Sequence, residues 1–269
     1  MGAMNEAPQT PGPEPDTDET VVPLRSRSIY LLPNLFTTAA MFAGFYAIVA
    51  AQDGRFTAGC VAIFVALLLD GVDGRVARMT HTQTAFGAQY DSLADLISFG
   101  LAPALVMYQW SLVHMNELAL GWARLGWLAA FFYTAATAMR LARFNVMVGS
   151  ADKRYFIGLP SPTAAALLSG LVWIGNDVGW AGEALRWPAF LLTVAAGGLM
   201  VSNVLYLSFK EIDYRSKVPF IGALLIVFAL MLLSFDPPKV LFSGFLAYTL
   251  SGPLLALHRW RRRHGHTRR

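Results

Sequence analysis

The feature that most constrains the fold is a series of apolar stretches, each long enough to cross a membrane as a helix. A transmembrane helix needs about 20 predominantly apolar residues. Eight stretches meet this requirement, over residues 31–51, 57–78, 88–112, 122–144, 161–178, 188–209, 218–235 and 238–258. Only 14% of the residues are charged, against about 25% in a soluble domain. We therefore expect an all-α integral membrane protein with about eight transmembrane helices.

The distribution of lysine and arginine predicts the orientation of these helices, because cytoplasmic connections carry an excess of both residues. With the N-terminus inside, 17 of the 21 Lys and Arg residues fall on the cytoplasmic side. We therefore predict a multi-pass protein of the inner (cytoplasmic) membrane with both termini in the cytoplasm. The same distribution explains the net charge of +4 without nucleic acid as a partner.

The two ends of the chain differ in composition from the apolar part. Residues 1–22 are rich in proline and acidic residues and show no apolar periodicity, which predicts a disordered tail. Residues 259–269 are strongly basic and are expected to lie against anionic lipid headgroups. The sequence therefore divides into an N-terminal tail, a transmembrane domain over residues 23–258 and a basic cytoplasmic tail.

Four carboxylates lie inside the predicted transmembrane segments, where an uncompensated charge is costly. Asp70 and Asp73 are spaced i, i+3 on the second segment, and Asp91 and Asp95 are spaced i, i+4 on the third. Each pair therefore shares one face of its helix. Counted from the short connection between the segments, Asp70 is level with Asp95, and Asp73 is level with Asp91. We expect the four carboxylates to converge across an antiparallel pair of helices.

Converging carboxylates cannot all stay ionised unless cations lie between them. Oxygen ligands favour Mg²⁺, Mn²⁺ or Ca²⁺ over zinc, and paired divalent ions recur in sites of phosphoryl transfer. Gly74 and Gly87 lie on the acidic faces and leave room for a ligand, and Arg78 is suited to a phosphate group. Two alternatives stay open at this point. The aspartates could pair with arginines and only hold helices together, or they could form the relay of an ion- or proton-coupled transporter.

The same two segments resemble a known family. The run from Asp70 to Arg78, followed by Gly87, Asp91 and Asp95, matches D-x-x-D-G-x-x-A-R-x8-G-x3-D-x3-D, the signature of the CDP-alcohol phosphotransferases, at every fixed position. Residues 33–37, 91–104, 140–145 and 156–162 are similar to the membrane-type phosphatidylserine synthases within that family. The resemblance covers most of residues 31–215 and favours an enzyme over a transporter.

The resemblance implies transfer of the phosphatidyl group of CDP-diacylglycerol to the hydroxyl of L-serine, with release of CMP, at an active site that faces the cytoplasm. It implies two divalent cations, Mg²⁺ or Mn²⁺, bound by Asp70, Asp73, Asp91 and Asp95. Asp95 would also act as the general base. The CDP part would be bound by Gly74, Arg78, Thr84 and Gly87. A homodimer would carry over from the family.

The carboxylate of L-serine requires a cation near the site. Arg140 and Arg143 lie at the cytosolic end of the fourth segment, at about the level of the acidic residues, and Lys210 follows the sixth segment. These three residues are candidate ligands for the acceptor or for a phosphate. Alternatively, the arginines extend to the membrane interface and Lys210 only follows the positive-inside rule. The same chemistry could then use choline, glycerol 3-phosphate or an inositol derivative.

Overall fold

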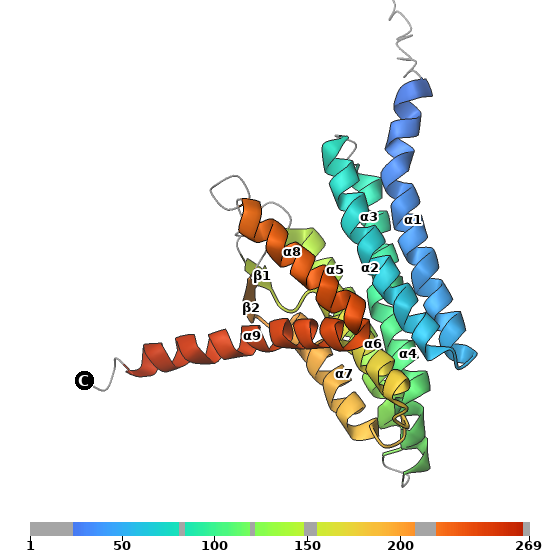
Figure 1. Ribbon diagram of the computed structural model, residues 1–269, viewed down its shortest axis with the longest axis vertical. Coiled ribbons are helices and arrows are strands. Elements are labelled where there is room, and N and C mark those ends of the chain that lie inside the picture. The colour runs from blue at the N-terminus through green and yellow to red at the C-terminus, as the bar shows by residue number, and fades with distance from the viewer. Residues whose placement is uncertain (1–23, 81–83, 119–121, 148–154, 208–218, 266–269) are drawn as a thin grey trace, which may run out of the picture.

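The computed structural model describes residues 24–80, 84–118, 122–147, 155–207 and 219–265, which are almost entirely helical (Figure 1). The α-helices are α1 (Leu24–Gln52), α2 (Phe56–Met79), α3 (Ala85–Asp95), α4 (Ala102–Trp110), α5 (Leu125–Met147), α6 (Ser161–Val178), α7 (Arg186–Val201), α8 (Pro219–Phe235) and α9 (Pro237–Gly265). A π-helix, η1 (Leu96–Leu101), joins α3 to α4, and a 3₁₀-helix, η2 (Leu112–Glu117), follows α4. Two short strands, β1 (Tyr155–Ile157) and β2 (Leu205–Leu207), pair antiparallel with Phe156 opposite Tyr206.

Four helical segments in the described part of the chain are long and apolar enough to cross a membrane. They are Asn34–Gln52, Phe56–Val76, Ala85–Trp110 and Pro237–Leu257. The helical fold with several long apolar helices is therefore confirmed. The count of eight transmembrane helices and the cytoplasmic position of both termini stay predictions.

The predicted segment 188–209 is wrong at its C-terminal end, because α7 ends at Val201 and the chain continues into β2. Ser202 leaves the helical region with φ −68° and ψ 164°. The chain then pairs with the segment before α6, where the backbone N–H of Gly158 donates to the Val204 carbonyl at 2.8 Å. Pairing between segments distant in sequence, which apolar periodicity does not report, therefore replaces the last turns of the predicted helix.

The predicted segment 88–112 is helical in the structure, but it is not one regular α-helix. It consists of α3, the π-helix η1 and α4. Pro103 lies in the first turn of α4, and a proline cannot donate the backbone hydrogen bond that a continuous α-helix requires. The change of helical geometry directly follows Asp95.

Small residues allow the helices to approach one another closely. α1 lies beside α2 and also packs against α3 and α4 (Figure 1). A Cβ atom on Gly59 of α2 would lie only 3.1 Å from the carbonyl oxygen of Ala47 on α1. Such contacts between backbones are typical of helix packing in membranes. The position of α1 against both acidic helices helps to bring them together.

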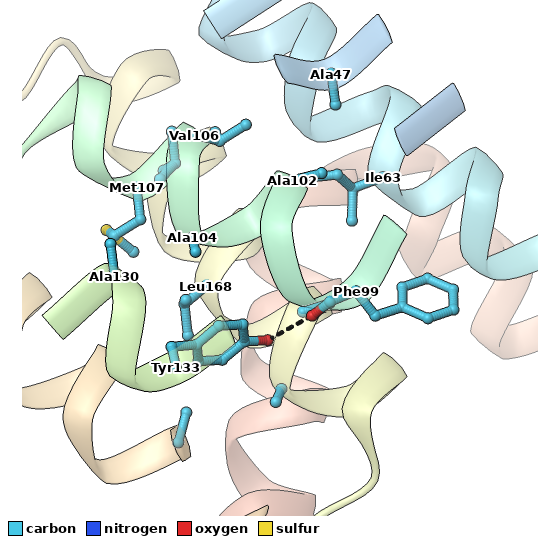
Figure 2. Packing of buried hydrophobic residues seen from close by; sticks show 14 of the residues in the cluster. Ala47, Ile63, Phe99, Ala102, Ala104, Val106, Met107, Ala130, Tyr133 and Leu168 are labelled. Carbon is cyan, nitrogen blue, oxygen red and sulfur yellow. Dashed lines mark hydrogen bonds between the residues drawn. The ribbon is translucent and has the colours of Figure 1, made fainter. Parts of the chain in front are cut away.

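The core lies where α4, α5 and α6 meet α1 and α2 (Figure 2). It contains Ile63, Met107, Tyr133 and Leu168, all of which are fully buried. α6 packs against α2, α4, α7 and α9. α9 crosses the bundle at α6, and its C-terminal half extends away from the other helices (Figure 1).

Candidate active site

Three of the four predicted aspartates converge in the structure. Asp70 lies on α2, and Asp91 and Asp95 lie on α3. One carboxylate oxygen from each of these residues lies within 4.8 Å of the others. All three side chains are half-buried. Because hard divalent cations prefer carboxylate oxygens, this carboxylate trio (Asp70, Asp91 and Asp95) could hold a divalent metal ion.

Asp73 lies one turn from Asp70 and has a different environment. Its side chain is buried, and it accepts a hydrogen bond from Thr37 Oγ1 on α1 at 2.7 Å. Asp73 also interacts electrostatically with Asp91. The structure therefore places Asp73 near the carboxylate trio. A hydroxyl from α1 holds one of the two Asp73 carboxylate oxygens. The sequence contained Thr37 within the segment similar to the family, but its spacing from Asp73 gave no sign of this contact.

The predicted CDP-binding residues lie toward the C-terminal end of α2 and at the N-terminal end of α3. A Cβ atom built on Gly74 would meet no atom of the described residues within 4 Å, so among those residues this position leaves open space beside the acidic site. The Thr84 hydroxyl caps the N-terminus of α3 by accepting a hydrogen bond from the Gly87 backbone N–H at 2.9 Å. The side chain of Arg78 and the whole of Lys210 lie outside the described residues. CDP binding by these residues stays a prediction.

Arg140 on α5 lies near the carboxylate trio and interacts electrostatically with Asp95. Its Nη1 donates to Ser161 Oγ at the start of α6, at 2.9 Å. Its Nε atom is buried, and none of the residues that the structure describes accepts a hydrogen bond from it. A buried donor without an acceptor is costly. This guanidinium is therefore suited to an anionic ligand beside Asp95.

Arg143, one turn further along α5, is bound to the backbone instead. Its Nη2 donates to the carbonyl oxygen of Ile157 in β1 at 3.0 Å, and its Nη1 donates to that of Val201 at the end of α7 at 3.3 Å. A cation at a helix C-terminus stabilises the last carbonyl groups. The two arginines that were predicted together therefore have different surroundings, and Arg140 is the one that faces the acidic site.

A further contact joins α5 to the acidic helix α3. Asn145 Nδ2 donates to Ser92 Oγ at 3.0 Å, directly beside Asp91. Ser92, Asn145 and Ser161, the partner of Arg140, all lie in segments similar to the family, but their spacing gave no sign of these contacts. Each of these hydrogen bonds joins two helices, so helical periodicity along the chain could not indicate them.

Comparison with known proteins agrees with the family resemblance of the aspartate motif. The sequence model of the CDP-alcohol phosphatidyltransferase family matches residues 30–196, which include all four aspartates. The chain is 38% identical over 191 residues to the CDP-diacylglycerol–serine O-phosphatidyltransferase of Helicobacter pylori, which covers 71% of this chain and 77% of that protein. It is 30% identical over 222 residues to the protein of the same name from Mycobacterium leprae, covering 81% of this chain and 69% of that protein. It is 32% identical over 181 residues to the archaetidylserine synthase of Methanothermobacter thermautotrophicus, covering 66% and 70%.

Proposed function

The chain belongs to the CDP-alcohol phosphatidyltransferase family, and we propose that it is a CDP-diacylglycerol–serine O-phosphatidyltransferase. It transfers the phosphatidyl group of CDP-diacylglycerol to L-serine and releases CMP. The structural observation that carries this proposal is the carboxylate trio, whose oxygens lie within 4.8 Å of one another inside the matched region. The serine acceptor is supported by the names of relatives that are 30% and 38% identical to this chain.

In the proposed reaction the serine hydroxyl oxygen attacks the phosphorus atom of the phosphatidyl group. A new oxygen–phosphorus bond forms, the bond to the CMP oxygen breaks, and CMP leaves with the bonding electron pair. A hydroxyl is a poor nucleophile until a base removes its proton. The family resemblance implies that Asp95 accepts this proton, and the place of its carboxylate in the trio supports this role.

Asp70, Asp73, Asp91 and Asp95 are proposed to hold two divalent cations, Mg²⁺ or Mn²⁺. Such ions, when bound, neutralise the diphosphate and stabilise the charge that develops on the leaving CMP. The Thr37 hydroxyl orients Asp73 from α1. Gly74, Arg78, Thr84 and Gly87 are proposed to bind the CDP part, and the open space at Gly74 supports this assignment.

Arg140 is proposed to bind the carboxylate of serine. Its buried Nε, which has no acceptor in the described part of the chain, and its electrostatic interaction with Asp95 support this role. Ser161 orients the guanidinium through Nη1. Arg143 supports the site indirectly, by joining β1 to the end of α7. A phosphate contact at Lys210 is retained from the sequence alone.

The placement in the membrane is proposed from the distribution of charge. The eight transmembrane helices are proposed from the apolar stretches. The cytoplasmic termini and an active site that faces the cytoplasm are proposed from the excess of lysine and arginine in the connections assigned to that side. A homodimer is proposed from the family resemblance.

An acceptor panel tests the proposed function. The purified chain in detergent is supplied with CDP-diacylglycerol, Mn²⁺ and one acceptor at a time, and CMP release is measured for L-serine, choline, glycerol 3-phosphate and inositol. L-serine is expected to give the highest kcat/KM. A higher value for another acceptor would retain the family chemistry and refute serine, and no CMP release with any acceptor would refute the transferase.

A further inference from the structure

The helix that carries Asp91 and Asp95 changes geometry directly after Asp95. Residues Leu96–Leu101 form the π-helix η1, and the backbone N–H of Ala102 donates to the carbonyl of Ile97. A π-helical turn holds one more residue than an α-helical turn, and one residue corresponds to about 100° of rotation around the helix. The direction of Asp95 relative to the buried helix α4 therefore depends on this turn.

A hydroxyl from another helix donates a hydrogen bond to η1. Because Pro103 has no backbone N–H, the carbonyl of Phe99, four residues earlier, lacks its α-helical donor. The Tyr133 hydroxyl on α5 donates to the Phe99 carbonyl oxygen at 3.0 Å (Figure 2). Both residues are fully buried. In an apolar core this hydroxyl supplies a donor that Pro103 cannot supply.

α1 holds the other side of the same turn. Ser98 Oγ donates to the carbonyl oxygen of Ala40 at 3.0 Å. The absence of a side chain at Gly44 permits this approach, because a Cβ atom there would lie 2.7 Å from Ser98. The π-helical turn is therefore held between α1 and α5, with one side-chain hydrogen bond on each side.

Tyr133 is also linked to the acidic site through Arg140. It precedes Arg140 by seven residues, two helical turns on the same face of α5, and the two side chains interact electrostatically. Arg140 in turn interacts electrostatically with Asp95. Tyr133 therefore contacts the turn that follows Asp95 and lies on the same face of α5 as the cation that interacts with Asp95.

We propose that Tyr133 is a positioning residue, whose hydroxyl holds the π-helical turn after Asp95 and thereby directs the Asp95 carboxylate toward Asp70 and Asp91. The kinetic part of this proposal rests on the proposed function. Its metal-binding part requires only that the carboxylate trio binds a divalent ion.

The chain contains a matched control for the loss of this hydrogen bond. Tyr206 in β2 is also fully buried, and its hydroxyl donates to the carbonyl oxygen of Thr249 at 3.1 Å. Thr249 lies four residues before Pro253, which is inside α9. Tyr206 therefore satisfies a carbonyl freed by a proline, as Tyr133 does, but on a helix that carries none of the four aspartates.

The test compares Tyr133→Phe with Tyr206→Phe in the purified full chain in detergent. Two quantities are measured: kcat for CMP release, and the Mn²⁺ concentration that gives half of the metal-dependent rise in Tm. Both variants are expected to have a lower Tm without metal. Only Tyr133→Phe is expected to lower kcat, by about five- to tenfold, and to raise the required Mn²⁺ concentration by a similar factor. The KM for CDP-diacylglycerol is expected to stay unchanged.

Two results would overturn the proposal. Tyr133→Phe could keep the Mn²⁺ titration and kcat of the wild type, or Tyr206→Phe could show the same losses as Tyr133→Phe.

The Mn²⁺ titration tests Tyr133 even if the wild type does not use serine. Failure of the proposed function is therefore distinguishable from failure of the proposed role of Tyr133. If Tyr133→Phe does not fold, Ser98→Ala removes the hydrogen bond on the α1 side of the turn. It is expected to weaken Mn²⁺ stabilisation, and an unchanged titration would refute the role of the turn.

Discussion

Replacing Arg140 by methionine removes the positive charge beside Asp95 while it keeps most of the apolar stem of the side chain. In the structure Nη1 is occupied by Ser161, and the buried Nε has no acceptor among the described residues. At least one charge-assisted hydrogen bond to the serine carboxylate is therefore expected to be lost. Such a bond contributes about 1.5–3 kcal/mol, so Arg140→Met should raise the KM for serine about 10- to 100-fold.

The assay is the initial rate of CMP release over a range of serine concentrations at saturating CDP-diacylglycerol. Ethanolamine lacks the carboxylate and should be a poor acceptor for the wild type. The preference for serine over ethanolamine should fall in Arg140→Met, because the variant loses affinity only for the acceptor with the carboxylate. The KM for CDP-diacylglycerol should change less than about twofold, well below the cost of one charge-assisted hydrogen bond.

Arg143→Met provides the comparison from the same helix face. Its guanidinium donates to the carbonyl groups of Ile157 and Val201, so its loss should lower Tm with a much smaller change in the KM for serine. The reasoning would be refuted if Arg140→Met kept the serine KM of the wild type. It would also be refuted if the variant lost affinity for CDP-diacylglycerol instead, since Arg140 would then bind the donor phosphates.

Three further predictions concern the acidic site and the loop before α6. Asp70→Asn or Asp91→Asn should abolish CMP release in a protein that still folds, and EDTA should stop the wild type until Mg²⁺ or Mn²⁺ is restored; full activity in EDTA after dialysis would contradict metal dependence. Asp95→Asn should lower kcat far more than the affinity for CDP-diacylglycerol measured by titration calorimetry, and loss of that binding would assign Asp95 to metal retention or structure. Gly158→Ala should lower Tm more than Gly179→Ala, since both glycines have positive φ (79° and 77°) but only at Gly158 would a Cβ atom collide, with the Met200 carbonyl. The backbone strain of a non-glycine residue at positive φ, which both variants share, costs about 1–2 kcal/mol. Equal losses of Tm would contradict the prediction, because they would show that the collision at Gly158 costs nothing.

The apolar stretches and the four aspartates follow from the sequence because both depend on local patterns. A run of about 20 apolar residues specifies a membrane-length helix wherever it occurs. The spacing of Asp91 and Asp95 places both on one face of α3, whatever that helix packs against. Counting residues from the connection was enough to predict that Asp70 approaches them, and their oxygens lie within 4.8 Å of one another.

Contacts between segments distant in the sequence decided three features that this local pattern left open. The Thr37 hydroxyl on α1 separates the surroundings of Asp73 from those of Asp70. Arg140 and Arg143 have different hydrogen-bond acceptors, a hydroxyl for Arg140 and a backbone carbonyl for Arg143. Their spacing alone predicts the same ligand-binding role for both. Pairing with the segment before α6 ended α7 at Val201.

The π-helical turn after Asp95 depends both on the local sequence and on contacts between helices. The sequence alone supplied Pro103, which removes one backbone donor and leaves the Phe99 carbonyl without its α-helical partner. Only the tertiary structure supplied Tyr133, from a helix that begins more than 20 residues later. The physical reason is that helical periodicity is set by hydrogen bonds within four residues of each other. The partner of a carbonyl that has lost such a bond is set by whichever helix packs against it.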